Sequence, residues 1–141
     1  MKEYQNKFRL ETEAKSANEG FSRVVVAAFA SQLDPTIDAI ADIKTAVSEA
    51  VTNCIVHAYK GYGGKIVITA TYTKDRMFCV SVKDFGCGID DVEKARTPLF
   101  TTDESGERSG MGFAIMEGFC DKVTVSSKVG RGTRVTMKKQ L

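Results

Sequence analysis

The sequence predicts an α/β two-layer sandwich in which a mostly antiparallel mixed sheet carries helices on one face. The order of the expected elements, β-α-α-β-β-loop-α-β-β, lacks the strict strand-helix alternation of a parallel doubly wound sheet. The composition, 43% hydrophobic and 27% charged residues, is ordinary for a globular chain. A chain of 141 residues removes roughly 70% of its unfolded surface from water on folding, which is enough for one core. We therefore expect residues 1–141 to form a single domain.

The first part of the chain predicts a strand and two helices. Residues 4–14 alternate loosely between apolar and charged side chains and predict an edge strand. Ser16 or Asn18 can cap a helix whose apolar side chains recur at three- and four-residue steps: Phe21, Val24, Val25, Ala28, Phe29 and Leu33. Pro35 suits the opening of a second helix, roughly 35–59. Its apolar stripe is Ile37, Ile40, Ile43, Val47, Val51 and Ile55.

The rest of the chain predicts two hairpins separated by a loop and a helix. Residues 65–73 and 77–85 are rich in β-branched and aromatic side chains and are joined at "KDR". The irregular stretch that follows, up to about residue 110, is typical of a functional loop. "FAIMEGFCDK" predicts a helix, and "VTVSSKVGRGTRVTMKK" predicts a final hairpin turned at "VGRG".

Charge and cysteine usage narrow the class of protein. Twenty Lys+Arg against eighteen Asp+Glu give a net charge of +2, and the basic residues are scattered, so no nucleic-acid footprint stands out. No run is long and apolar enough for a signal sequence or a membrane span, and we expect a cytoplasmic protein without membrane or direct nucleic-acid partners. The four cysteines form no C-x-x-C pair and there is one histidine, which makes a zinc site improbable.

A first polar constellation lies in the second helix, in "SEAVTNCIVHAY". Glu49, Asn53 and His57 are spaced by four and share one line of the helix, with apolar residues on both flanks. Glu49 could act as a general base and Asn53 could give an oxygen to magnesium. The alternative is a partly exposed helix with both side chains in solvent.

A second constellation is "VSVKDFGCGID", an acidic residue at a strand end followed by two glycines. Asp84 could accept a hydrogen bond from an exocyclic amine, while Gly86 and Gly88 would allow close approach of a flat ligand. "DFG" lacks the other protein-kinase motifs, and a calcium loop with Asp90 and Asp91 matches no EF-hand spacing. A plain turn after a strand remains an alternative.

A third constellation is "ERSGMGFAIM", where Gly110 and Gly112 open a helix. Free N–H groups at a helix start can hold a phosphate, and Arg108 could add positive charge. The motif is neither a Walker loop nor a dinucleotide fingerprint. Together the three constellations could hold adenine, metal and phosphates at once.

The three motifs resemble those of the GHKL (Bergerat) nucleotide-binding fold, which gyrase, heat-shock protein 90, MutL and histidine kinases share. Within it, "SEAVTNCIVHAY", "RTPLFTT" and "ERSGMGFAIME" are most similar to the sporulation anti-sigma factors that are serine kinases. The resemblance implies Glu49 as catalytic base, Asn53 as magnesium ligand, Asp84 as the adenine-reading carboxylate and a lid over 96–110. Implied nucleotide-binding residues are Asn53, Asp84, Gly86, Gly88, Thr101, Thr102, Arg108, Ser109, Gly110, Met111 and Gly112.

The resemblance also implies ligands and partners. ATP, ADP and Mg²⁺ would be the cofactors, and the protein would form a homodimer. It would inhibit a sporulation sigma factor in its ATP state and phosphorylate a serine of a small anti-anti-sigma protein. Glu19 and Arg23 resemble the partner-binding surface, although a solvated helix face is the alternative. Rival functions are a detached histidine-kinase catalytic domain, a gyrase-type clamp fragment and a non-catalytic sequestering module.

Overall fold

The computed structural model describes residues 3–96 and 112–141. In these residues five strands form one sheet of order β1-β2-β3-β5-β4, and every neighbouring pair is antiparallel. The strands are β1 (Asn6–Glu13), β2 (Lys65–Tyr72), β3 (Met77–Asp84), β4 (Lys122–Lys128) and β5 (Gly132–Gln140). The helices are α1 (Ala17–Ala30), α2 (Ile37–Asn53), the short α3 (Val92–Ala95) and α4 (Gly112–Phe119).

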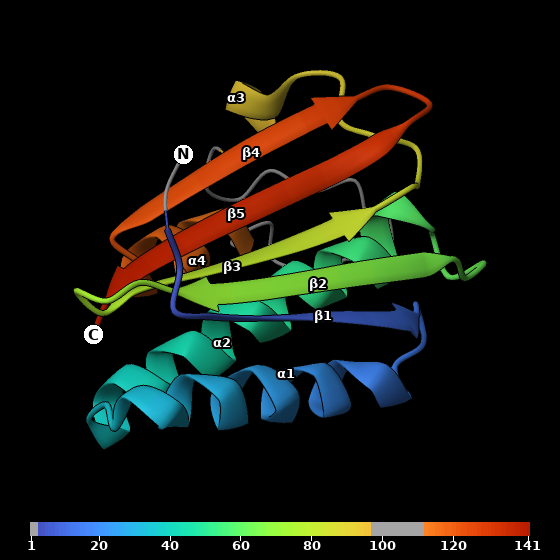
Figure 1. The fold of residues 1–141 in the computed structure, drawn as a ribbon. Helices are drawn as coiled ribbons and strands as arrows, with labels where there is room; N and C mark the ends of the chain where they lie inside the picture. The colour runs from blue at the N-terminus through green and yellow to red at the C-terminus, as the bar shows by residue number, and fades with distance from the viewer. Residues whose placement is uncertain (1–2, 97–111) are drawn as a thin grey trace.

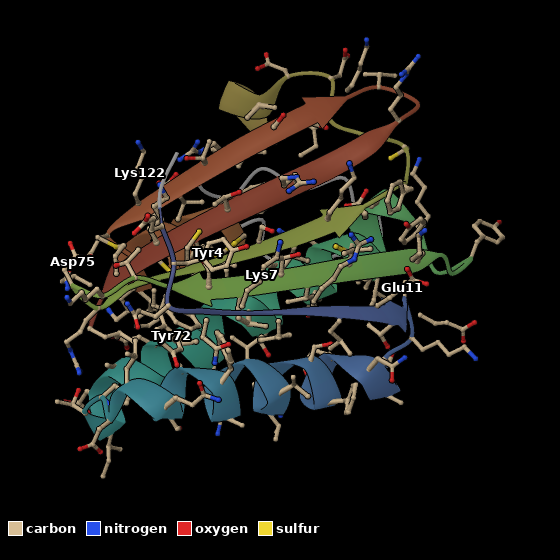
Figure 2. The ribbon with its side chains drawn as sticks, in the orientation of Figure 1. Tyr4, Lys7, Glu11, Tyr72, Asp75 and Lys122 are labelled. Carbon is tan, nitrogen blue, oxygen red and sulfur yellow. The ribbon has the colours of Figure 1, made fainter. Side chains whose placement is uncertain are left out.

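The sheet and its helices form two layers. Helices α1, α2 and α4 cover one face of the sheet, and the other face is open (Figure 1). Figure 2 looks onto this open face, from which Lys7 and Glu11 of β1 and Lys122 of β4 project. The predicted fold class, with an edge strand at the N-terminus and two hairpins, is confirmed.

The core lies between the covered face of the sheet and the helices. Period-two alternation turns every second side chain inward, so that Ile66, Ile68, Phe78, Val80 and Val82 from the central strands are at most 3% exposed. They meet buried side chains of α1, α2 and α4: Val26, Phe29, Ala30, Ile43, Ala46, Val47, Ala50, Val51 and Met116. The ring of Phe29 packs edge-on against Phe8, with 4.8 Å between centroids.

The predicted apolar stripes hold only in part. Helix α1 faces the core with Ser22, Val26, Phe29 and Ala30, while Phe21 and Val24 are 50% and 57% exposed. Ile37, the first residue of the predicted stripe of α2, is 88% exposed. Periodicity predicted the helices correctly, but it did not show which of two apolar sides of a helix packs against the core.

Helix α2 begins and ends differently from the prediction. It begins at Ile37, two residues after Pro35, and its N-cap is Thr36, whose hydroxyl accepts a hydrogen bond from the Ala39 N–H at 3.1 Å. The regular helix ends at Asn53 and continues as the π-helical turn η2 (Cys54–Ala58), in which the Tyr59 N–H donates to the Cys54 carbonyl at 3.0 Å. His57, the third residue of the predicted polar line, lies within this π turn and not in the regular helix.

Candidate functional site

Two of the predicted site residues, Glu49 and Asn53, converge on the first residue of α4. A Cβ added to Gly112 would lie 3.1 Å from Asn53 Oδ1 and 3.4 Å from Glu49 Oε2. Both polar side chains are half-buried between α2 and α4. The absence of a side chain at Gly112 therefore keeps open the space beside both oxygens.

The third predicted residue, Asp84, is the last residue of β3. Its side chain points toward the core and is 4% exposed. Its Oδ1 accepts hydrogen bonds from the Gly86 N–H at 2.9 Å and the Thr133 N–H at 3.2 Å. Burial raises the pKa of this carboxyl, and hydrogen bonds from Gly86, from the Cys54 thiol and from Thr133 act in the opposite direction. The carboxyl is thus held in place by β5 and by the turn that follows β3.

Cys54 connects Asp84 to the helix that carries Asn53. The thiol is 3% exposed and lies beside the Asp84 carboxyl. Burial, and then the charge of Asp84, raise the pKa of Cys54 well above its ordinary value, so the thiol stays protonated and can donate. The contact of this thiol with the site could not be read from the sequence.

The glycines after Asp84 are explained by contacts within the chain. A Cβ on Gly86 would lie 2.4 Å from the Ala58 carbonyl oxygen, and one on Gly88 would lie 2.3 Å from that of Lys128. Gly88 also has φ +79°, a conformation that favours glycine. Both glycines therefore let the loop after β3 pack against η2 and the final hairpin, which is a different reason from the predicted approach of a ligand.

Tyr59 closes the same end of the molecule. Its hydroxyl donates to the Lys65 carbonyl at 2.5 Å and accepts from the Phe85 N–H at 2.7 Å. The ring also lies where a Cβ of Gly64 would be, 2.3 Å from Cε1. The end of η2 is thereby joined to the start of β2 and the end of β3, so the elements that carry Asn53 and Asp84 are held together.

The predicted lid lies largely outside the described residues, as do Thr101, Thr102, Arg108, Ser109, Gly110 and Met111. Its first residue, Arg96, is described and is anchored. Arg96 Nε donates to Glu117 Oε1 of α4 at 2.8 Å, and its Nη2 donates to the Val123 carbonyl of β4 at 3.0 Å. The segment from residue 97 therefore starts from a point tied to α4 and β4.

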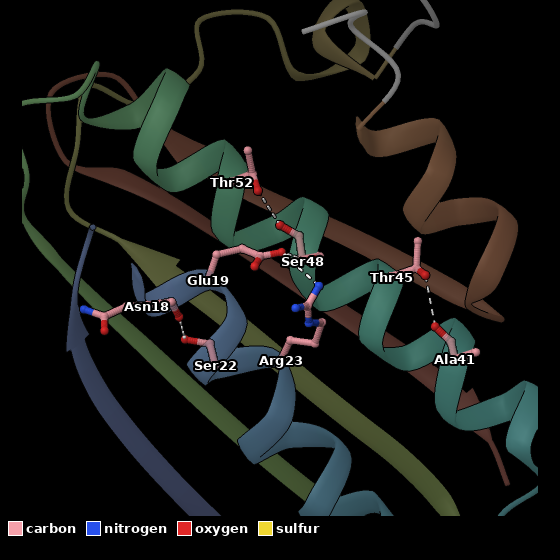
Figure 3. Close-up of polar contacts among 8 residues, drawn as sticks. All are labelled: Asn18, Glu19, Ser22, Arg23, Ala41, Thr45, Ser48 and Thr52. Carbon is pink, nitrogen blue, oxygen red and sulfur yellow. Dashed lines mark hydrogen bonds and ion pairs between the residues drawn. The ribbon is translucent and has the colours of Figure 1, made fainter. Parts of the chain in front are cut away.

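The predicted partner-binding residues lie on α1 against α2. Arg23 Nη1 lies 3.5 Å from Glu19 Oε1, and the same carboxylate accepts a hydrogen bond from the Ser48 hydroxyl (Figure 3). Arg23 Nε is buried without a hydrogen-bond partner among the described residues. Ser48, which sequence reasoning missed, precedes Glu49 in α2, so the pair on α1 is tied to the helix that carries the candidate base.

The arrangement supplies oxygen ligands, a buried acceptor and an anion site. Asn53 Oδ1 and Glu49 Oε2 are hard oxygen donors of the kind that Mg²⁺ prefers. Asp84 is a held acceptor for an amine, and the first N–H groups of α4 lack partners within the helix. In the described part of the chain no three His, Cys, Asp or Glu side chains form a metal cluster, and no helix there is long and apolar enough to cross a membrane.

Comparison with known families identifies the class first. Residues 12–139 match the family described as the histidine kinase-like ATPase domain. That match spans all the helices and strands β2, β3 and β4, the end of β1 and nearly all of β5, and it includes Glu49, Asn53, Asp84 and Gly112. The class is therefore a nucleotide-binding ATPase domain.

Curated relatives narrow the class further. An anti-sigma F factor from Caldanaerobacter subterraneus subsp. tengcongensis is 56% identical over 99% of this chain and 96% of its own length. Another, from Clostridium acetobutylicum, is 52% identical over 96% of this chain and 94% of its own length. The chain belongs to the anti-sigma F factor family within the histidine kinase-like ATPases.

Solved structures agree on the fold. The RsbU and RsbW domains of Rv1364c from Mycobacterium tuberculosis match 97% of this chain with a TM-score of 0.69 and 21% identity, and the chain spans 32% of that protein. A histidine kinase domain from Erythrobacter litoralis matches 87% of this chain with a TM-score of 0.58 and 20% identity, and the chain spans 61% of it. At these identities the likeness concerns the fold alone.

Proposed function

We propose that this protein is an anti-sigma factor with protein serine kinase activity. In its ATP state it binds and inhibits a sporulation sigma factor of RNA polymerase, and it phosphorylates a serine of a small anti-anti-sigma protein. The observation that carries the proposal is the convergence of Glu49 and Asn53 on Gly112, since it brings a carboxylate and an amide oxygen beside a helix N-terminus. The family membership and the names of the relatives support it.

In the proposed reaction Glu49 accepts the proton of the substrate serine as the serine oxygen bonds to the γ-phosphorus. The bond from that phosphorus to the β,γ-bridging oxygen breaks, and ADP leaves. Asn53 would hold Mg²⁺, which when bound neutralises phosphate charge. Asp84 accepts from the adenine amine, and the first N–H groups of α4 face the phosphates. The residues predicted on 101–111, including Arg108, belong to the same proposal.

Transfer of radiolabelled γ-phosphate separates the candidate functions. The purified protein is incubated with γ-labelled ATP, Mg²⁺ and an anti-anti-sigma protein. Acid-stable phosphoserine on that partner is the expected product. Acid-labile phosphohistidine would indicate a histidine kinase, and ATP-dependent binding without transfer would indicate a sequestering module.

The proposal includes the protein's organisation and location. Residues 1–141 act as one domain in the cytoplasm, and two copies form a homodimer. The edge strands β1 and β4 are surfaces where copies could meet. Light scattering after size-exclusion chromatography gives the mass directly, and a monomer at micromolar concentration would contradict the dimer.

Gly112→Ala tests the convergence on α4. The added methyl would lie 3.1 Å from Asn53 Oδ1, so the Asn53 side chain must shift by a few tenths of an ångström, and it would lie in contact with Glu49 Oε2 at 3.4 Å. We expect phosphate transfer to fall about tenfold or more, because small misplacements at a reacting centre are costly. Gly118→Ala is the matched control in the same helix, since nothing lies within 4 Å of its Cβ. This control should keep activity and gain about 0.5–1 kcal/mol of stability.

Ser48→Ala tests the tie between α1 and α2. It removes the hydroxyl that donates to Glu19 and leaves the Glu19–Arg23 ion pair intact. We expect sigma-factor affinity to fall about three- to tenfold, as loss of one hydrogen bond predicts, with ATP affinity unchanged. Thr45→Ala is the control, because the Thr45 hydroxyl donates only to the Ala41 carbonyl of its own helix at 3.0 Å (Figure 3). Equal effects in both variants would refute a role for Ser48 in partner binding.

A further inference from the structure

We propose that the open face of the sheet carries a docking site for an acidic segment of a protein partner. The site is formed by four cationic side chains, Lys83, Lys128, Arg131 and Arg134, which are named the basic corner here. With Asp84, Ser126, Ser127, Gly132 and Thr133 they line an open pocket of about 320 Å³. Three of the four are exposed, and Lys83 is half-buried.

The side chain of Lys83, in the basic corner, lies on the opposite face of the sheet from the Asp84 carboxyl. Lys83 and Asp84 are consecutive residues of β3, and consecutive side chains of a strand point to opposite faces. Asp84 is buried under the helices, whereas Lys83 projects from the open face with Arg134 beside it. Asp84 also lines the pocket, so competition with ATP tests whether a ligand at the basic corner binds separately from the nucleotide.

The positions of these cations destabilise the sheet. Lys83 of β3 is the register partner of Arg134 of β5, and further along the same face Lys122 is the register partner of Lys138. Like charges directly opposite one another on adjacent strands are destabilising. A bound group of negative charge would relieve this repulsion at the basic corner.

The described part of the chain does not neutralise the basic corner. No carboxylate in that part forms an ion pair with Lys83, Lys128, Arg131 or Arg134. The Lys83 ammonium instead lies 5.1 Å from the centre of the Phe85 ring, which it shares with Lys65 at 4.9 Å. The net charge of the whole chain is only +2, so four cationic side chains around one pocket make a local excess of positive charge.

The surroundings favour an acidic protein segment over a nucleic acid. Glu11 and Glu13 of β1 project from the same face, so a long polyanion crossing the sheet would meet negative charge. A short acidic segment can end before β1. Phe85, whose ring lies under the Lys83 ammonium, and Val129, which follows Lys128 in the chain, are 45% and 63% exposed and offer the apolar contacts of a protein interface.

Fluorescence anisotropy with a labelled polyglutamate peptide of about eight residues tests the site on the full chain. We expect saturable binding that weakens as salt rises, because the contacts are between exposed charges. The double variant Arg131→Glu/Arg134→Glu should lose about tenfold or more in affinity. The control Lys7→Glu/Arg9→Glu makes the same charge change on β1 of the same face and should change affinity less than about threefold. Thermal melting should show both variants folded.

Several results would overturn the proposal. These are no measurable peptide binding, equal loss in both double variants, and displacement of the peptide by saturating ATP. Tighter binding of a single-stranded oligonucleotide with the same number of charges would make the surface a nucleic-acid site instead. The single variant Arg134→Glu adds an independent readout. It places a negative charge opposite Lys83 on the adjacent strand, so the melting temperature should not fall. The affinity for the peptide should fall.

Discussion

Asp84→Asn should lower ATP affinity by at least about thirtyfold while the protein stays folded. The carboxylate is 4% exposed and is held through Oδ1 by the N–H groups of Gly86 and Thr133. The asparagine side chain has one oxygen and one NH2 group in place of two oxygens. If its oxygen keeps the hydrogen bonds from Gly86 and Thr133, its NH2 group faces the adenine amine, and two donors meet. Hydrogen bonds to buried charged groups are worth about 1.5–3 kcal/mol, and leaving a group unsatisfied costs a similar amount. Isothermal titration calorimetry with ATP measures the change.

Asp38→Asn is the matched control for this variant. It makes the same chemical change in the first turn of α2, away from Asp84, at an exposed side chain. ATP affinity should be unchanged, and helix stability should fall by a few tenths of a kcal/mol because a charge is lost near the positive end of the helix dipole. Tight ATP binding by Asp84→Asn, with Asp38→Asn also unaffected, would remove Asp84 from the adenine site.

Glu49→Gln should abolish phosphate transfer to serine, by about a hundred- to ten-thousandfold, and leave ATP affinity within about threefold. The substitution keeps the size of the side chain beside Gly112 and Asn53 but removes a proton acceptor, and general base catalysis contributes about this much. Single-turnover transfer to the anti-anti-sigma protein, measured next to ATP titration, separates the two effects.

Glu13→Gln serves as the control for Glu49→Gln, since Glu13 is an exposed side chain at the end of β1. Its transfer rate should match that of the unmodified protein. If Glu49→Gln kept more than about a tenth of the rate, the base would be another group, because loss of a true base is rarely so mild.

Periodicity and motif spacing predicted most of the fold. The two hairpins, the edge position of β1 and the three covering helices follow from alternation in strands and from four-residue steps in helices, which are properties of local sequence. Glu49 and Asn53 share a face for the same reason, and the structure brings that face to Gly112. Local sequence therefore predicted well the features that depend on residues within one helical turn or one strand.

Contacts between distant segments were predicted less well. The hydrogen bond from Ser48 to Glu19 spans 29 positions, and the packing of Gly86 against Ala58 joins a loop to a helix end. Nothing in the residues near Gly86 distinguishes a glycine needed by a ligand from one needed by a carbonyl of the same chain. The exposed side of α1 shows the same limit, because Phe21 and Val24 are as apolar as Val26 and Phe29.

Because of the π turn η2, the geometry of the site depends on the exact number of residues in this turn. It ends in the Ala58 carbonyl, which accepts from the Cys87 N–H at 3.1 Å, and begins at Cys54 beside Asp84. A π turn carries one residue more than an α turn. The side chains of residues 55–57 can vary while the turn persists, but a chain one residue shorter would turn the Ala58 carbonyl away from the loop after β3. An insertion or deletion in this segment is therefore a larger change for the protein than any single substitution there.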